Sequence, residues 1–205
     1  MLALDEFVLW VNAGKPYKTS KEYIDAAKAA NGSFKMAGTG SKQEDQIITV
    51  ALEKATGLKF TYIPFRGGGE AVNAIMSGST PIGLFGEGNV IGNIQAGQTT
   101  PLVMMNNIKS PNFPNVPLLT DVGYNGPPSR SWYGIFAPAG TPKPIVDRMS
   151  KEIGAIINTP AFNERHIKAR SLVPAANTPE QFADEIRRER PVAERVVREA
   201  GFEQQ

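Results

Sequence analysis

Residues 60–76 read FTYIPFRGGGEAVNAIM, and this stretch decides the fold class. A short run of aromatic and β-branched residues leads into a turn made of Arg66 and three glycines, and a helical apolar pattern begins directly after it. Similar units lie on either side, with turns at Gly38 to Ser41 and at Gly86 to Asn89. Repeated alternation of strand, turn and helix predicts an α/β fold, with a mainly parallel sheet that carries helices on both faces.

The alternation extends over most of the chain. We expect strands at residues 7–11, 34–37, 60–64, 82–85, 102–105 and 132–137. Thr19 with Glu22 is expected to cap a helix that stops at Asn31-Gly32. Proline-rich sequence at residues 111–117 predicts a loop, because proline removes backbone donors that a sheet needs.

Helices are expected to dominate after residue 142, at residues 145–157, 161–169 and 180–200. Thr141 is the expected cap of the first of these helices, with Pro142 at its first helical position. Pro191 is expected to kink or break the last one.

Composition excludes several classes of function. The chain has 205 residues and a formal net charge of +2, so it lacks the basic field that a nucleic-acid partner requires. Cysteine is absent and His166 is the one histidine, which argues against a metal site, thiol chemistry and Ser-His-Asp catalysis. No glycine turn has the spacing of a nucleotide-binding motif, so no cofactor is expected. No apolar run is long enough to span a membrane, and residues 1–5 do not read as part of a signal peptide.

The three glycine-rich turns are the candidate binding site. In a parallel sheet they lie on one edge, outside the carboxyl ends of the strands, where open α/β sheets bind ligands. Glycine lets a ligand approach the backbone, and free amides at helix starts attract an anion. We therefore expect a site for a carboxylate at Gly38, Thr39, Gly40, Ser41, Arg66, Gly67, Gly68, Glu87 and Asn89.

Each polar residue of this set also has a purely structural interpretation. Ser41 could serve as a helix N-cap, Arg66 as a surface charge and Glu87 as a solvated turn carboxylate. Trp132 and Tyr133 could line a cleft or belong to the core. His166, on a polar helical segment, is expected to be exposed and without a role.

Four short motifs in series give a resemblance to a known family. They are residues 37–41 (AGTGS), 62–71 (YIPFRGGGEA), 94–97 (IQAG) and 132–142 (WYGIFAPAGTP), with the proline-rich loop between the third and the fourth. In this order and at these spacings the chain resembles the solute receptors of tripartite tricarboxylate transporters, often called Bug receptors.

The resemblance implies a periplasmic-binding-protein-like fold of two α/β domains joined by crossing strands. It also implies a small organic carboxylate held in the cleft between them, delivery to a membrane permease, and a periplasmic location. Family members are longer and begin with a further domain. On this basis residues 1–138 are expected to form the second clamp domain with its hinge strands. Residues 139–205 are then helices that would pack on the missing first domain. Two departures from the family are Glu44, where many relatives have histidine, and Pro191.

The leading hypothesis is therefore a binding protein that is not an enzyme, here truncated. A second hypothesis is a truncated product that self-associates into a homo-oligomer through surface left by the missing domain. A third hypothesis is an α/β enzyme that uses Ser41 or Glu87. It is the weakest of the three hypotheses, because the sequence shows no partner residues for catalysis.

Overall fold

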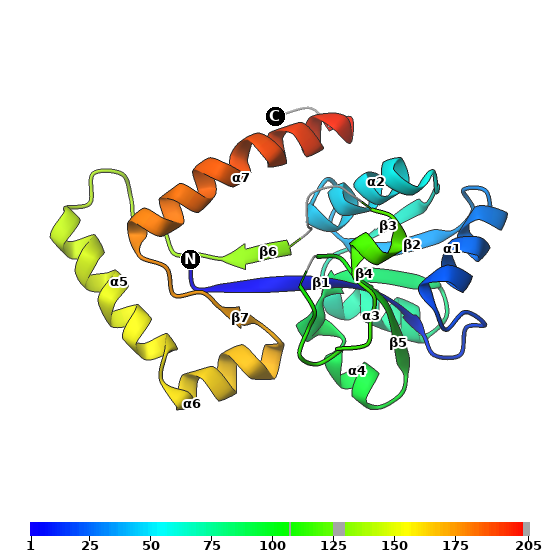
Figure 1. Cartoon of the computed structure of the whole chain (residues 1–205), viewed down its shortest axis with the longest axis horizontal. Coiled ribbons are helices and arrows are strands. Elements are labelled where there is room, and N and C mark those ends of the chain that lie inside the picture. Colours follow the sequence, from blue (N-terminus) through cyan, green and yellow to red (C-terminus); the bar gives the residue numbers. More distant parts are fainter. Residues whose placement is uncertain (107, 125–129, 203–205) are drawn as a thin grey trace.

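The computed structural model describes residues 1–106, 108–124 and 130–202 (Figure 1). A five-stranded sheet has the order β3-β2-β4-β1-β5, formed by β1 (Ala3–Asn12), β2 (Lys35–Thr39), β3 (Thr61–Phe65), β4 (Ile82–Gly86) and β5 (Thr99–Met104). Two short strands, β6 (Arg130–Tyr133) and β7 (Val173–Pro174), pair with the beginning of β1. The predicted α/β class and the helices on both faces are confirmed.

Helices α1 (Ser20–Ala29) and α2 (Glu44–Thr56) cover one face of the sheet, and α3 (Gly68–Met76) and α4 (Ile91–Gln95) cover the other. Side chains of β1 alternate between the two cores, as the period of a strand requires. Leu9 packs with Tyr23 and Leu52 on the first face, and Trp10 packs with Ile75 on the second. The fully buried run at the centre of β1 therefore belongs to both cores.

The sheet is mixed, whereas a mainly parallel sheet was expected. Strands β2, β3 and β4 are mutually parallel, but β1 runs antiparallel to both of its neighbours, β4 and β5. The N-terminal half of β1 therefore lies at the same edge of the sheet as the carboxyl ends of β2, β3 and β4. Figure 1 shows β1 beginning in the second part of the molecule and running into this sheet.

The second part of the molecule is mainly helical. It contains α5 (Lys143–Ile157), α6 (Pro160–Phe162), a π-helical turn at Asn163–Ile167 and α7 (Pro179–Glu199). Helix α7 spans the top of Figure 1, and the backbone carbonyl of Glu199, at its end, accepts a hydrogen bond from Lys54 of α2.

The local sequence signals predicted the start of α1 correctly, but they did not predict the start of α5 or the course of α7. The predicted capping box of Thr19 and Glu22 is confirmed. The predicted cap at Thr141 is wrong, because Pro142 is the N-cap of α5 and the Thr141 hydroxyl donates to the carbonyl of Pro138. Of the kink or break expected at Pro191, the break is wrong, since α7 continues through this residue. Pro191 is exposed, so water can reach the carbonyl that loses its helical donor.

Candidate functional site

The first glycine turn, residues 38–41, is tied to its own helix. The backbone NH and the hydroxyl of Thr39 both donate to Oδ2 of Asp45, at 2.6 and 2.8 Å. Gly38 is buried, and a Cβ there would lie 2.7 Å from the ring of Tyr62 and 2.8 Å from Cβ of Asp45. The Tyr62 hydroxyl donates to the carbonyl of Thr39 at 3.1 Å. Gly38 therefore makes room for these side chains, and the donors of Thr39 are engaged within the protein.

Gly40 and Ser41 complete this turn and face outward. Gly40 has a φ of 60°, and its NH donates to the carbonyl of Phe65 at 2.8 Å, which joins the first turn to the end of β3. Ser41 is exposed. The alternative that Ser41 caps α2 is wrong, because the N-cap of that helix is Gln43.

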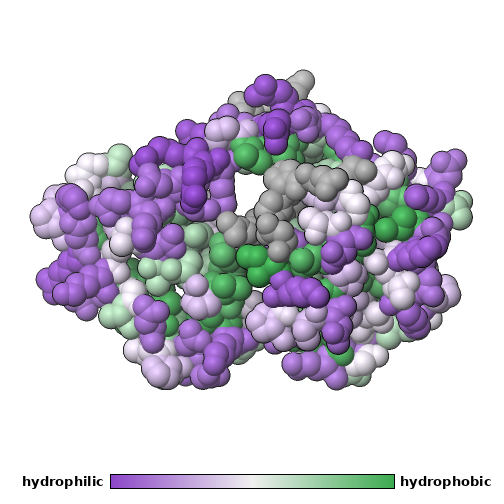
Figure 2. Space-filling model, viewed as in Figure 1, coloured by the Kyte–Doolittle hydropathy of each residue, from purple (hydrophilic) through white to green (hydrophobic). Residues whose placement is uncertain are grey.

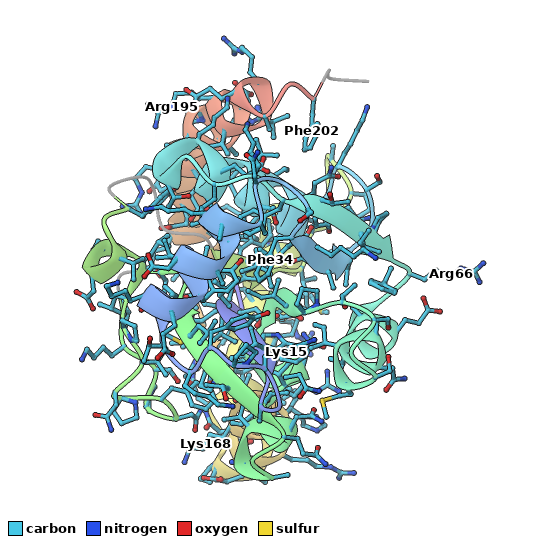
Figure 3. All side chains as sticks on the ribbon, turned by 90° about the vertical axis from the view of Figure 1, so that its right-hand side faces the viewer. Lys15, Phe34, Arg66, Lys168, Arg195 and Phe202 are labelled. Atoms are coloured by element: carbon cyan, nitrogen blue, oxygen red, sulfur yellow. The ribbon has the colours of Figure 1, made fainter. Side chains whose placement is uncertain are left out.

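The second turn, residues 66–69, begins α3. Gly67 is the N-cap of this helix, and no side chain caps it. Gly68 lies against the third turn, since a Cβ at Gly68 would be 2.8 Å from Oδ1 of Asn89. Arg66 is exposed and its side chain points away from the rest of the molecule (Figure 3). The backbone of Arg66 is held by Glu70, whose carboxylate accepts from the Arg66 NH at 3.2 Å.

The third turn, residues 86–89, connects the two parts of the molecule. Glu87 is only 2% exposed, and its carboxylate accepts a hydrogen bond from Asn112 of the proline-rich loop. The Asn112 amide also lies 3.3 Å from the hydroxyl of Ser171, which comes after the π-helical turn. Asn89 is exposed and donates to the carbonyl of Gly86 at 3.2 Å. Glu87 thus holds a loop in position, whereas Asn89 stays at the surface.

Asp5 is the residue at this edge that sequence reasoning missed. Because Phe7 pairs with Gly86, the beginning of β1 crosses the end of β4, and a Cβ at Gly86 would lie 2.6 Å from Oδ2 of Asp5. The exposed side chain of Tyr133 reaches across from β6, and its hydroxyl donates to Oδ2 of Asp5 at 3.3 Å. The interpretation of Tyr133 as a core residue is wrong, since 53% of its surface is exposed. The sequence does show two acidic residues, Asp5 and Glu6, directly before the apolar run at residues 7–11. Placing Asp5 at this edge requires the knowledge that β1 runs antiparallel to β4.

The edge is rich in negative charge. Burial raises the pKa of Asp5 to about 6; the hydrogen bond from Tyr133 lowers it, and the carboxylates of Glu6, Glu87 and Glu44 raise it. Burial likewise raises the pKa of Asp45 to about 6, against the hydrogen bonds from Thr39. Both carboxylates are mainly ionised at neutral pH, and the charged groups that act on them most strongly are other carboxylates.

Other candidate features are weaker. Trp132 lies in the aromatic cluster of the second part, where its indole NH donates to Glu189 at 3.0 Å and its ring packs edge-on against Phe182. His166 is exposed beside the ring of Phe162. Among the residues that the structure describes, no three His, Asp or Glu side chains are arranged to hold a metal ion. No helix in the described ranges combines the length and the apolar character of a membrane span.

The three turns therefore form one continuous edge. The first turn joins the second through the Gly40 NH, the second meets the third at Gly68 and Asn89, and the third meets β1 at Gly86 and Asp5. The missing side chains at Gly68 and Gly86 make room for Asn89 and Asp5, whereas a Cβ at Gly67 or Gly69 would have no heavy atom within 4 Å. The backbone at the start of α3 is therefore open to a ligand. Such an edge can bind a small molecule through main-chain groups, with Asp5 and Tyr133 as the nearby polar side chains.

Comparison with known proteins agrees with this architecture. The chain is 28% identical over 182 residues to protein BugT of Bordetella pertussis, an alignment that covers 87% of this chain and 54% of the relative. The chain thus spans about half the length of this curated relative. Its fold matches the structure of periplasmic binding protein BugD with a TM-score of 0.88 at 24% identity, covering 100% of this chain and 69% of that one. A second structure, of a periplasmic transporter, matches with a TM-score of 0.87 at 26% identity, covering 96% of this chain and 65% of that chain.

The family whose sequence pattern matches is the tripartite tricarboxylate transporter family receptor, and the match runs over residues 1–201. This family consists of solute-binding proteins rather than enzymes, in agreement with the predicted class. The chain belongs to the tripartite tricarboxylate transporter receptor family.

Proposed function

We propose that the protein is a periplasmic receptor that captures a small organic carboxylate for a tripartite tricarboxylate-type transporter. The observation that carries the proposal is the joining of three glycine-rich turns into one edge, in a chain that belongs to this receptor family. Structures that share the fold include one of a protein with adipate and one with bound malate. A small carboxylate is therefore the class of solute to test first, and a membrane permease is the expected partner.

The proposed contacts of the ligand carboxylate are main-chain groups at Gly67 and Gly68, with the side chains of Ser41 and Asn89. Gly38 and Gly40 shape the first turn, because one is buried against Tyr62 and the NH of the other donates to Phe65. Ser41 and Asn89 are exposed at the edge and can turn toward a ligand. Thr39 and Glu87 support the turns through Asp45 and Asn112. Arg66 points outward, so its direct participation would require its side chain to change rotamer.

We further propose that residues 1–138 form one clamp domain with its hinge strands, and that residues 139–205 pack against a further domain of the receptor. A groove of about 450 Å³ between α5, α7 and the segment after β6 supports this. Its wall includes Phe136, Ile145 and Met149, which are 66%, 52% and 54% exposed. Apolar surface of this kind usually marks an interaction site. Figure 2 shows an opening between the two parts of the molecule below α7, with apolar residues along its lower rim.

The experiment is a thermal-shift screen of the chain against small carboxylates, repeated with Ser41→Ala, Arg66→Ala and Asn89→Ala. A solute that stabilises the chain, with loss of the effect in Ser41→Ala or Asn89→Ala, supports the proposal. No stabilisation by any acid, at concentrations up to tens of millimolar, contradicts binding by this edge in the chain as it stands.

The same apolar groove also favours a second candidate, self-association of the chain. Two copies that bury their grooves against each other would show a mass that rises with concentration in sedimentation. Phe136→Ser should reduce that association, because it places a polar group at the most exposed aromatic position of the groove. A mass that stays monomeric at all concentrations would exclude this candidate.

A further inference from the structure

The pair formed by Asp5 and Tyr133 bears on which carboxylate the site accepts. Asp5 lies over Gly86, where the missing side chain leaves room for its carboxyl group. Tyr133 donates to one oxygen of Asp5 from the neighbouring strand, 3.3 Å away. Two separate segments of the chain thus orient one carboxylate at the joined edge of the glycine turns.

Glu6, Asp45 and Glu87 are buried, with 6%, 1% and 2% of their surface exposed, whereas Asp5 is only half-buried. The buried carboxylate of Glu6 accepts from Asn106, and that of Glu87 accepts from Asn112. Asp45 accepts both donors of Thr39. Asp5 is therefore the carboxylate of this edge best placed to contact a solute.

The charges that act most strongly on Asp5 are carboxylates, and the cation that acts on its partner Tyr133 is Arg170. A solute that carries only negative charge would therefore add to the repulsion at Asp5. The first turn of α2 holds Glu44 and Asp45 and the first turn of α3 holds Glu70, so protein carboxylates already offset the positive ends of both helices. The candidate cation Arg66 points outward. An ionised carboxylate that becomes buried on ligand binding is stabilised when a cation pairs with it.

We propose that Asp5, positioned by Tyr133, binds a protonated amino group of the solute, so that the site prefers an amino acid to the plain dicarboxylic acid of the same skeleton. The solute carboxylate would then contact the glycine turns while its ammonium group contacts Asp5. This inference rests on the proposed function, and it deepens that function by naming the solute class.

The test compares three pairs that differ only in an amino group: succinate with aspartate, glutarate with glutamate, and adipate with 2-aminoadipate. Affinities are measured at pH 7.5 by calorimetry on the chain. We expect at least one amino acid to bind about tenfold more tightly than its partner, as one well-placed charge pair provides. In Asp5→Asn this preference should disappear, while the affinity for the plain dicarboxylate stays equal or rises.

Asp25→Asn is the matched control. It removes the same charge from the exposed face of α1, where Asp25 pairs with Lys21, and should leave the preference unchanged. Tyr133→Phe should reduce the preference for the amino acid without changing the affinity for the dicarboxylate, which a purely structural role would not do. Melting curves of each variant establish that it is folded.

Three results would overturn the inference. One is tighter binding of the plain dicarboxylate than of its amino partner. Another is an equal loss of both affinities in Asp5→Asn. A third is a preference for the amino acid that persists unchanged in Asp5→Asn. Binding of neither class would refute the proposed function and the inference together, whereas binding of dicarboxylates alone would refute only the inference.

Discussion

Replacement of Gly88 by alanine tests the contact that joins the two parts of the molecule. A Cβ at Gly88 would overlap the backbone carbonyl oxygen of Arg170 and would lie 2.9 Å from its carbonyl carbon. Backbone cannot swing aside as the end of a side chain can, so the segment at residues 168–171 must shift. Forcing extra volume into a packed contact costs about 1–3 kcal/mol. For a chain of this length that corresponds to a melting temperature lower by about 2–12 °C.

Gly92→Ala is the matched control for this prediction. Gly92 lies in α4, four residues away, and a Cβ there has no heavy atom within 4 Å. Alanine in a helix is favoured over glycine by about 0.5–1 kcal/mol, so Gly92→Ala should leave the melting temperature equal or slightly higher.

Differential scanning calorimetry compares the two variants, and hydrogen exchange reports on residues 168–172. We expect faster exchange in that segment only in Gly88→Ala, because the Asn112 contacts to Glu87 and Ser171 depend on its position. Equal stability of the two variants, with unchanged exchange, would refute the proposed close contact between the third turn and Arg170.

Three further predictions concern stability. Thr19→Ala should lower the unfolding free energy by about 1 kcal/mol in chemical denaturation, since it removes the side-chain half of the capping box at α1; an unchanged midpoint would contradict the role of the cap. Tyr23→Phe should leave stability equal or raise it, because the buried Tyr23 hydroxyl has no hydrogen-bond partner within the described residues, whereas Tyr23→Ala should cost about 3–5 kcal/mol. A large loss in Tyr23→Phe would reveal a partner for that hydroxyl. The raised pKa of Asp45, about 6, means that the folded state binds this proton more tightly than the unfolded state, so the contribution of Asp45 to stability falls as the pH rises from about 4 to about 6. Asp45→Asn should therefore be more stable than the parent at pH 7, by up to about 3 kcal/mol, and nearly equal to it at pH 4; a constant difference across this range would contradict the burial of a charged Asp45.

Features that follow from neighbouring residues were predictable. The cap of α1, the end of α2 at Gly57 with its φ of 71°, and the order of strands, turns and helices depend on side chains within a few positions of each other. The errors at Thr141 and Pro191 arose where a local preference was overridden. At the start of α5 the Thr141 side chain turns back to donate to the Pro138 carbonyl, and it accepts no hydrogen bond from the first turn of the helix. In α7 the proline lies on a face open to water.

The sequence by itself determined that three glycine-rich turns follow three strands, because period and turn chemistry are written along the chain. Only the tertiary structure decided what lies beside those turns. The antiparallel direction of β1 brings Asp5 to Gly86, β6 brings Tyr133 to Asp5, and the proline-rich loop brings Asn112 to Glu87. Each of these contacts joins residues that are 25 or more positions apart. Strand pairing sets the register of these contacts. The residues near each position in the sequence do not indicate which distant segment will lie beside it.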